Sequence, residues 1–230
     1  AYQYSLVSGN SPFDKWYYGG QSNAVNESVK KGFEIFSGKG NCTACHLMNE
    51  KYALFTDEKL HNTGMGFATS MYVEPPRKKI VLAPGIEVDV DTSVYANDSR
   101  FKNEIAPNDL GLYVITQDPH DRWKFRTPTL RNVELSAPYM HNGQLSTLKE
   151  VVEFYNKGGT RSVGKHKNET ISPLMFELNL TENEVNDVVT FLKALTGENM
   201  DELIMDAFAV PVGDVSLDDP NWFHDNKLKY

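Results

Sequence analysis

The residue types with the most distinctive chemistry lie together in the stretch GNCTACHLM, from Gly40 to Met48. This stretch holds the only two cysteines of the chain, Cys42 and Cys45, and His46 follows them directly. Two thiols and an imidazole at this spacing suit three kinds of chemistry: thiol redox exchange, metal binding and covalent attachment of haem. The spacing alone leaves these three open.

The surroundings of the pair separate these alternatives. A structural zinc site usually needs four Cys or His ligands in two pairs, but only one cysteine pair is present and the six histidines are scattered. A thioredoxin-like C-x-x-C would follow a strand, whereas the residues before Cys42 resemble a helix. The C-x-x-C-H order favours one covalent haem c, with thioethers at Cys42 and Cys45 and iron bound by His46. The remaining alternative is two buried thiols beside an unrelated histidine.

Charge and hydropathy exclude some classes of partner. The formal net charge is -8 and the pI is about 5.3, so we expect no nucleic-acid partner, because phosphate binding needs a basic surface. No apolar run of about 18 residues occurs, so we predict no membrane span. The start, AYQYSLVSGNSPFDKW, has no signal-peptide pattern. Because haem c is attached outside the bacterial cytoplasm, we expect an exported, periplasmic protein whose signal peptide has been removed.

Three segments carry helical periodicity and must position the motif. In ESVKKGFEIFSGKG, apolar residues recur at i, i+4 and i+7, and Gly38 and Gly40 end the pattern. STLKEVVEFYNKGG begins with a capping box, Thr147 and Glu150. LTENEVNDVVTFLKALTG begins with a second one, Thr181 and Glu184, and we expect Gly197 to end that helix. We predict that the last of these helices packs against the first.

The helix, glycine break and C-x-x-C-H resemble the opening of a class I cytochrome c domain. We therefore predict an all-α fold, a class I cytochrome c-like haem domain over 26–197. Within it, residues 51–123 are rich in Pro, Gly and Asn and form a loop-rich insertion, with IEVDVDTSVY as a short strand. Residues 198–230 form an extended C-terminal tail that packs on a surface or on a partner.

Longer motifs resemble one family. FRTPTLRNVELSAPYMHNGQLSTLKEVVEFYNKGG, together with DLGLYVITQDPHDRWKFRTPTLRN, FTDEKLHNTGMG and LVSGNSPFDKW, is similar to the C-terminal haem domain of the MauG and bacterial di-haem cytochrome c peroxidase family. The resemblance covers most of residues 1–197. It implies that residues 1–25 are a linker from an N-terminal haem domain that is missing here. The peroxidatic haem, its acid–base residues and a bridging tryptophan would lie in that half.

The resemblance also implies a ligand opposite His46. The peroxidases place a methionine on the helix after the APY segment, and MauG places a tyrosine there. An ungapped count from Ala137 puts this position at Tyr155, on the apolar face of its helix. The alternative is a core tyrosine with a hydrogen-bonded hydroxyl. Met140, in APYMHNG, is the second candidate for the ligand.

Further positions carry over from the family. A calcium ion in the peroxidases takes backbone carbonyls that correspond here to Ser136 and Pro138, and its third protein ligand is an asparagine of the missing half. Arg126 and Arg131 could pair with haem propionates, because a guanidinium suits carboxylates; surface salt bridges are the alternative. MauG has a tryptophan two residues before its first haem cysteine, for passing oxidising equivalents to a protein substrate. Gly40 stands there, which argues against that substrate.

The resulting hypothesis is the haem c-containing half of a MauG-like or di-haem peroxidase-type oxidoreductase that depends on hydrogen peroxide. It would relay or store electrons for a second haem, on another domain or chain, and exchange them with a small redox protein. No residue of this half is assigned to catalysis. The alternatives are a mono-haem cytochrome c electron carrier and, with less in its favour, a haem-based sensor with an exchangeable ligand.

Overall fold

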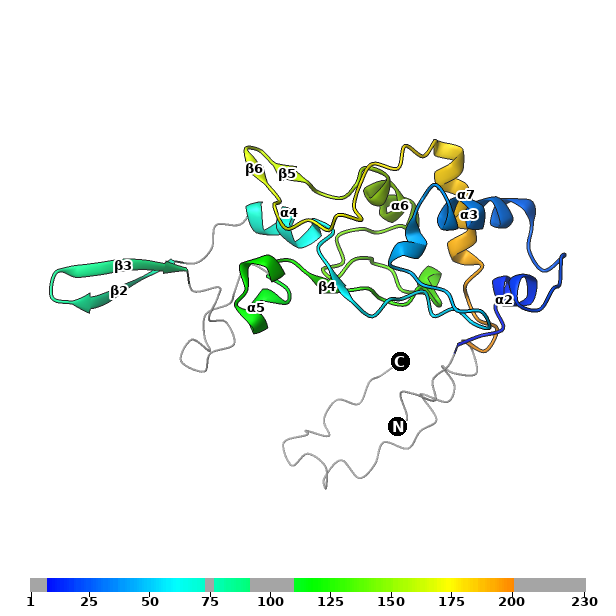
Figure 1. Cartoon of the computed structure of the whole chain (residues 1–230), viewed down its shortest axis with the longest axis horizontal. Coiled ribbons are helices and arrows are strands. Elements are labelled where there is room, and N and C mark those ends of the chain that lie inside the picture. Colours follow the sequence, from blue (N-terminus) through cyan, green and yellow to red (C-terminus); the bar gives the residue numbers. More distant parts are fainter. Residues whose placement is uncertain (1–7, 73–76, 92–109, 201–230) are drawn as a thin grey trace, which may run out of the picture.

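The chain forms a helical body from which one β-hairpin projects (Figure 1). The structure is a computed structural model and describes residues 8–72, 77–91 and 110–200. Helices α2, α3, α6 and α7 gather at one end of the molecule. Helices α4 and α5 lie nearer the middle, and the hairpin β2–β3 extends away at the opposite end.

The described residues are not all α-helical. Six α-helices are accompanied there by three separate two-stranded antiparallel sheets. The helices are α2 Pro12–Tyr17, α3 Glu27–Ser37, α4 Met65–Tyr72, α5 Tyr113–Thr116, α6 Leu148–Asn156 and α7 Glu182–Lys193. The sheets pair β1 Leu60–His61 with β4 Phe125–Arg126, β2 Arg77–Ala83 with β3 Ile86–Asp91, and β5 Ser162–Val163 with β6 His166–Lys167. The predicted all-α class is therefore wrong. The fold is mixed, although its helical part is consistent with a cytochrome c-like domain.

The three predicted helices are confirmed by their caps. The Asn26 side chain accepts from the Val29 N–H at the start of α3, and the Gly38 and Gly40 N–H groups donate to carbonyls of its last turns. Both expected capping boxes are present at the starts of α6 and α7. Helix α7 ends at Lys193, earlier than the predicted stop at Gly197. These caps satisfy backbone groups that helix ends otherwise leave without partners.

Helices α3 and α7 pack against each other, as predicted, and they cross at Gly32. A Cβ atom at this position would lie 2.0 Å from the Asp187 carbonyl oxygen and 2.8 Å from the Cβ of Phe191. The first obstacle is backbone, so it cannot turn aside as a side chain could. Only glycine allows the two helices to approach this closely.

We expect Gly32→Ala to separate the two helices and to lower the free energy of unfolding by about 1–3 kcal/mol, the usual range for an overpacked core. Urea unfolding followed by circular dichroism would measure this. Gly9→Ala is the matched control, because a Cβ there meets nothing within 4 Å, and it should stay within about 0.5 kcal/mol of the wild type. Equal stability of the two variants would show that the helices can move apart without cost.

Aromatic side chains fill the centre of the helical body. Phe13, Phe36, Phe55 and Phe191 are at most 2% exposed, and their ring centroids lie 4.9–6.3 Å apart in five pairs. Such contacts contribute beyond the burial of area alone. Phe13 belongs to α2 and Phe55 to the loop after the C-x-x-C-H motif. Helix α2 is thereby part of the same core as α3 and α7.

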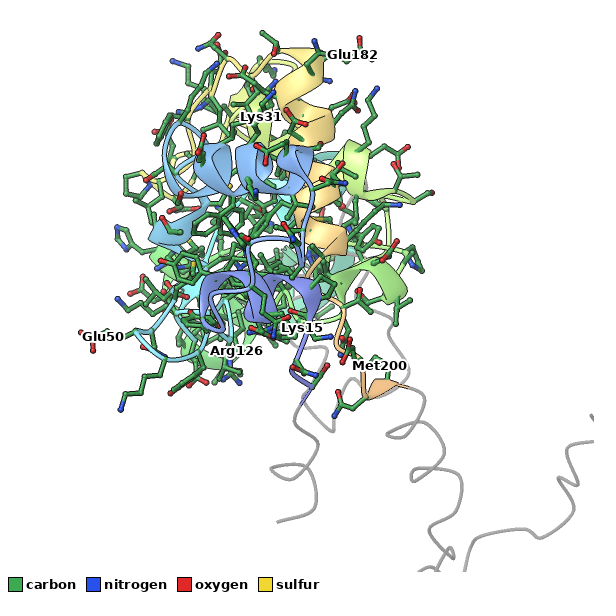
Figure 2. All side chains as sticks on the ribbon, turned by 90° about the vertical axis from the view of Figure 1, so that its right-hand side faces the viewer. Lys15, Lys31, Glu50, Arg126, Glu182 and Met200 are labelled. Carbon is green, nitrogen blue, oxygen red and sulfur yellow. The ribbon has the colours of Figure 1, made fainter. Side chains whose placement is uncertain are left out.

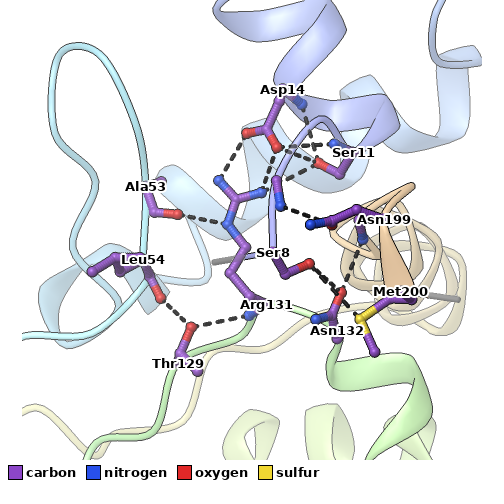
Figure 3. Close-up of polar contacts among 12 residues, drawn as sticks. Ser8, Ser11, Asp14, Ala53, Leu54, Thr129, Arg131, Asn132, Asn199 and Met200 are labelled. Carbon is purple, nitrogen blue, oxygen red and sulfur yellow. Dashed lines mark hydrogen bonds and ion pairs between the residues drawn. The ribbon is translucent and has the colours of Figure 1, made fainter. Parts of the chain in front are cut away.

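Arg131 fastens α2 to that loop (Figure 3). Its guanidinium forms two 2.7 Å bonds to the Asp14 carboxylate, and its Nε donates to the Ala53 carbonyl oxygen at 2.7 Å. It also lies over the Phe55 ring, 5.4 Å from the centroid. Burial of Asp14 would raise the pKa of its carboxyl, but the bonds from Arg131 and Ser11 outweigh burial and hold that pKa below its usual value.

The neighbouring Asn132 joins the two ends of the body. Its Oδ1 accepts from the Ser8 hydroxyl at 3.0 Å and from the Gly197 N–H at 2.9 Å. Lys15 of α2 forms an ion pair with Glu198, close to Met200 (Figure 2). The first and last described segments therefore meet beside α2. The rest of the predicted tail, residues 201–230, lies outside the described residues.

The predicted insertion, 51–123, contains structure of its own. A second small core forms from Phe67, Leu110 and Trp123, and the Trp123 indole donates to the Ser70 hydroxyl at 2.9 Å. The expected strand is confirmed for IEVDVD, which is β3; the following residues of that stretch lie outside the described ranges. In the described part of the chain, no helix is long and apolar enough to cross a membrane.

The hairpin β2–β3 is amphipathic. Ile80 pairs with Val88 on one face, and Lys79 pairs with Asp89 on the other. Alternation along β3 adds Ile86 to the apolar face. The Ile86 and Val88 side chains are 55% and 36% exposed. The hairpin therefore projects from the body with an apolar face open to solvent.

Candidate metal centre

The cysteine pair lies on a single tight turn directly after α3. Residues Cys42–Ala44 form a short 3-10 helix, and the His46 N–H donates to the Cys42 carbonyl oxygen at 2.9 Å. Asn41 begins the turn with a left-handed φ of 49°. Both thiols are free and half-buried. Burial raises the pKa of Cys42 to about 12, and the nearby Cys45 adds to the effect. Local backbone bonding thus presents both sulfurs and the imidazole from one turn.

The His46 ring is held in one orientation by the loop that follows it. Its Nδ1 lies 2.7 Å from the Phe55 carbonyl oxygen, which can only accept, so Nδ1 carries the proton and Nε2 keeps its lone pair for a metal. Burial is the main cause that lowers the pKa of His46, while the Phe55 bond and the charge of Asp57 oppose it. The half-buried ring is therefore a neutral imidazole, the form that binds metal.

Tyr155 approaches the cysteines from α6. The pKa of its phenol is raised, first by burial and then by the negative charge that Cys42 and Cys45 would carry as thiolates. The phenol is therefore within electrostatic reach of both sulfurs. Met140 lies in a turn that its own carbonyl closes with the Gly143 N–H at 3.2 Å. Among the described contacts, none brings its sulfur to the cysteines.

These donors fit an iron porphyrin attached through both thiols. One turn supplies the two sulfurs and a neutral imidazole, a second helix supplies a phenol oxygen, and the apolar core of the body lies alongside. A histidine ligand oriented by a backbone carbonyl is a usual arrangement in metal sites. Haem iron accepts either His or Tyr as an axial ligand.

Gly40, two residues before Cys42, is buried and has little space. A Cβ added there would lie 2.8 Å from the Ile35 carbonyl oxygen and 3.3 Å from the Cys42 sulfur. An indole at this position would require the end of α3 to shift. The local packing therefore suits a residue without a side chain.

The sequence did not reveal two features beside the motif, namely the pair Asp57–His61 and the Phe55 carbonyl. The Asp57 carboxylate accepts from the His61 Nε2 at 2.7 Å, and one ligand atom of each lies within 4.8 Å of the other and of the Cys45 sulfur. The signal was present in DEKLH, whose acidic residue and histidine stand at i and i+4. Phe55 left no such signal, because its contribution is a backbone carbonyl.

The remaining predicted site residues lie around this centre. Arg126 is exposed on β4 and pairs with Glu58 at 3.4 Å. The Arg131 bonds to Asp14 would have to be exchanged before it could bind a propionate. Ser136 and Pro138 are exposed, on either side of the cis peptide bond between Ala137 and Pro138.

The chain is similar to known haem proteins. No family model matches the chain. The cytochrome-c peroxidase IdrP2 of Denitromonas iodatirespirans is 38% identical over 197 residues, which are 86% of this chain and 47% of the relative. The methylamine utilization protein MauG of Methylorubrum extorquens is 30% identical over 197 residues, 86% of this chain and 42% of the relative.

Solved structures agree with these relatives. A MauG-like protein associated with microbial copper homeostasis matches with a TM-score of 0.59 and 29% identity, over 86% of this chain and 55% of the other. The diheme peroxidase BthA of Burkholderia thailandensis shares the fold, with a TM-score of 0.56 at 22% identity, over 86% of this chain and 48% of that one.

Fold, donor set and relatives together define a c-type haem protein with a cytochrome c-like body. More specifically, the chain is homologous over 86% of its length to MauG and to the cytochrome-c peroxidases. It spans about half the length of the curated relatives that it matches.

Proposed function

We propose that this chain is the haem c-containing half of a peroxidase-type oxidoreductase and that it stores and relays electrons for a second, peroxide-reacting haem. Cys42 and Cys45 attach the haem, and His46 and Tyr155 bind its iron. The observation that carries the proposal is the single turn that presents the Cys42 and Cys45 sulfurs together with the His46 ring, whose orientation the Phe55 carbonyl fixes. The electrostatic coupling of Tyr155 to both cysteines supports its role as the further ligand. A bound haem supplies one-electron redox chemistry there.

The protein groups around the haem explain why this half would store electrons rather than react with peroxide. The Phe55 carbonyl oxygen accepts a hydrogen bond from the His46 Nδ1 and so fixes the orientation of the ring. With His46 and Tyr155 both holding the iron, peroxide would find no open coordination position. Peroxide chemistry therefore needs another haem, and a second haem on a preceding domain or a separate chain is the main partner. No residue of this half is assigned to catalysis.

The outer parts of the assembly follow from the same proposal. Residues 26–197 form the haem domain together with α2, whose Phe13 lies in the same core. A calcium ion bound by the backbone carbonyls of Ser136 and Pro138 would stabilise the contact between the halves. Arg126 is the accessible residue that could bind a haem propionate. The protein works in the periplasm, where a small redox protein delivers electrons.

The haem count of the native particle tests this function. The chain should be purified without denaturation from its own cells, its haems counted by native mass spectrometry, and its peroxide turnover measured with a reduced cytochrome. We expect two haems in each particle and turnover that stops in Cys42→Ser/Cys45→Ser. A single haem, with no partner chain and no turnover, would leave the mono-haem electron carrier as the function.

A further inference from the structure

Three oxidisable side chains follow one another at the end of α2 and belong to no ligand set described above. They are Trp16, Tyr17 and Tyr18. The Tyr17 ring lies 6.0 Å from Trp16 and 5.0 Å from Tyr18, measured between centroids. Tyr17 is 47% exposed, and the other two are half-buried. Indole and phenol are the side chains that give up one electron most readily, so this group could exchange electrons with solvent.

A short aromatic route joins this group to the axial histidine. His46 donates to the Phe55 carbonyl at 2.7 Å. The Phe55 ring lies 5.6 Å from Phe13, and Phe13 is stacked on Tyr17 at 5.3 Å with an interplanar angle of 14°. Phe13 also meets Trp16 edge-on at 6.1 Å. Both phenylalanines are 0% exposed, so the route is dry and closely packed. Electron tunnelling decays steeply with distance and is favoured by such contacts.

A second route runs through the backbone. The Tyr18 hydroxyl donates to the Asn49 carbonyl oxygen at 3.0 Å, and Asn49 is only three residues after His46. Tyr18 itself is poorly suited to oxidation, because a tyrosine radical forms with loss of the phenolic proton and a carbonyl cannot take that proton. Burial, first, and then Tyr17 raise the pKa of Tyr18 to about 12. Tyr18 therefore serves as a link, and Trp16 and Tyr17 are the oxidisable members.

Arg131 fixes the geometry of the aromatic route. It binds Asp14 of α2 and the Ala53 carbonyl while its guanidinium covers the Phe55 ring. The helix that carries Trp16 and Tyr17 is thus tied to the loop that holds His46. A fixed separation is what an electron route needs, because transfer rates change steeply with distance.

We propose that Trp16 and Tyr17 form a surface port through which the small redox protein of the proposed function, as an external one-electron donor, reduces the haem side of the protein. Trp16 or Tyr17 passes one electron inward along Phe13 and Phe55, and the donor then refills the oxidised side chain. Trp16 keeps its proton as a radical cation, whereas the exposed Tyr17 releases its proton to water and regains one on reduction.

The port rests on the proposed function, in which hydrogen peroxide at the second haem is the oxidant. One hydrogen peroxide, two electrons and two protons give two water molecules. Two donor proteins, each losing one electron, and two protons from water balance the reaction. The port itself makes and breaks no heavy-atom bond.

A flash experiment tests the port without peroxide. The haem-loaded protein is reduced, and tris(bipyridine)ruthenium(III) is generated outside it by a laser flash with a sacrificial quencher. Oxidation of the haem is then followed by absorbance. We expect Trp16→Phe/Tyr17→Phe to slow the haem oxidation by at least about tenfold, equivalent to about 1.4 kcal/mol in the barrier. A transient radical should appear in the wild type and be absent from the double variant.

Tyr52→Phe is the matched control. Tyr52 is 55% exposed and lies on the loop just after the haem motif, but it has no described ring contact that leads to His46. Its rate should stay within about twofold of the wild type, a difference of only about 0.4 kcal/mol. Phenylalanine keeps an aromatic ring at every changed position, and an unchanged haem spectrum would confirm that each variant folds.

The outcomes separate the port from the proposed function. An unchanged flash rate in the double variant overturns the port, whether or not peroxide is turned over. A slowed flash rate supports the port even if the wild type shows no peroxide turnover, in which case the peroxidase function fails and the port serves a simple electron carrier. Equal slowing in Tyr52→Phe would also overturn the port, because the effect would then be unspecific.

Discussion

Replacing Tyr155 with methionine is expected to raise the reduction potential of the haem by roughly 0.1–0.3 V, within the span of about 0.8 V that axial ligands cover. A phenolate is a charged donor that stabilises ferric iron, whereas a thioether is neutral and favours the ferrous state. Removing the charge therefore shifts the equilibrium toward the reduced haem. Spectroelectrochemical titration of the two proteins would measure the shift.

Tyr155→Phe should give a different result, because phenylalanine offers no ligand atom. We expect its ferric electron paramagnetic resonance spectrum to change and the open position to bind small ligands such as cyanide. Tyr139→Phe is the matched control: Tyr139 is a buried tyrosine whose hydroxyl lies 3.5 Å from the Glu134 carbonyl. An unchanged spectrum in Tyr155→Phe, together with a changed one in Met140→Leu, would transfer the ligand role to Met140.

Replacing Arg131 with alanine is expected to lower the free energy of unfolding by about 3–5 kcal/mol, the range for removing one partner of a buried ion pair. The Asp14 and Arg131 side chains are only 17% and 9% exposed, so water would compensate the stranded carboxylate poorly. The Tm should fall by roughly 6–20 °C at 2–4 °C per kcal/mol. Differential scanning calorimetry would record it.

The same variant should change the response to acid. In the wild type the folded pKa of Asp14 is below its ordinary value of 3.8, so its contribution to stability is complete above that value and is lost as the pH falls through the folded pKa. Without Arg131, only the Ser11 bonds still oppose burial, so the pKa of Asp14 rises relative to the wild type. The variant therefore loses less stability than the wild type on acidification, and the difference in stability between the two proteins should shrink as the pH falls.

Arg126→Ala provides the control for both measurements. Arg126 and its partner Glu58 are 65% and 66% exposed, and surface pairs contribute little, about 0–1 kcal/mol. Its Tm and acid profile should match the wild type. If Arg131→Ala lowered the Tm no more than Arg126→Ala, the Asp14–Arg131 ion pair would not be a main source of stability in the core.

Local sequence signals predicted the helices, whereas the pairing of strands far apart in the sequence could not be predicted. The capping boxes at Thr147 and Thr181 need only four consecutive residues, so they can be read from sequence. The strand Leu60–His61 pairs with Phe125–Arg126, far away along the chain. Two residues are too few for an alternating pattern, and for that reason the expectation of an all-α fold failed.

The candidate site divides in the same way. The C-x-x-C-H order predicted the chemistry of Cys42, Cys45 and His46, because these roles depend on residue type and spacing. Nothing in the sequence marked the Phe55 carbonyl, since every residue has one. Arg131 was expected to need a carboxylate, but its residue type could not say that Asp14 would supply it.

The hairpin β2–β3 bears on how this protein can change during evolution. Among the described elements, its extensive contact is within itself, and the haem-side helices α3, α6 and α7 lie at the other end of the molecule (Figure 1). Mutations that lengthen or shorten this hairpin, the arm of the molecule, or that change its charge, would leave the redox centre intact. Selection can therefore act on the arm and on the centre separately, so the arm can acquire new contacts while electron transfer is preserved.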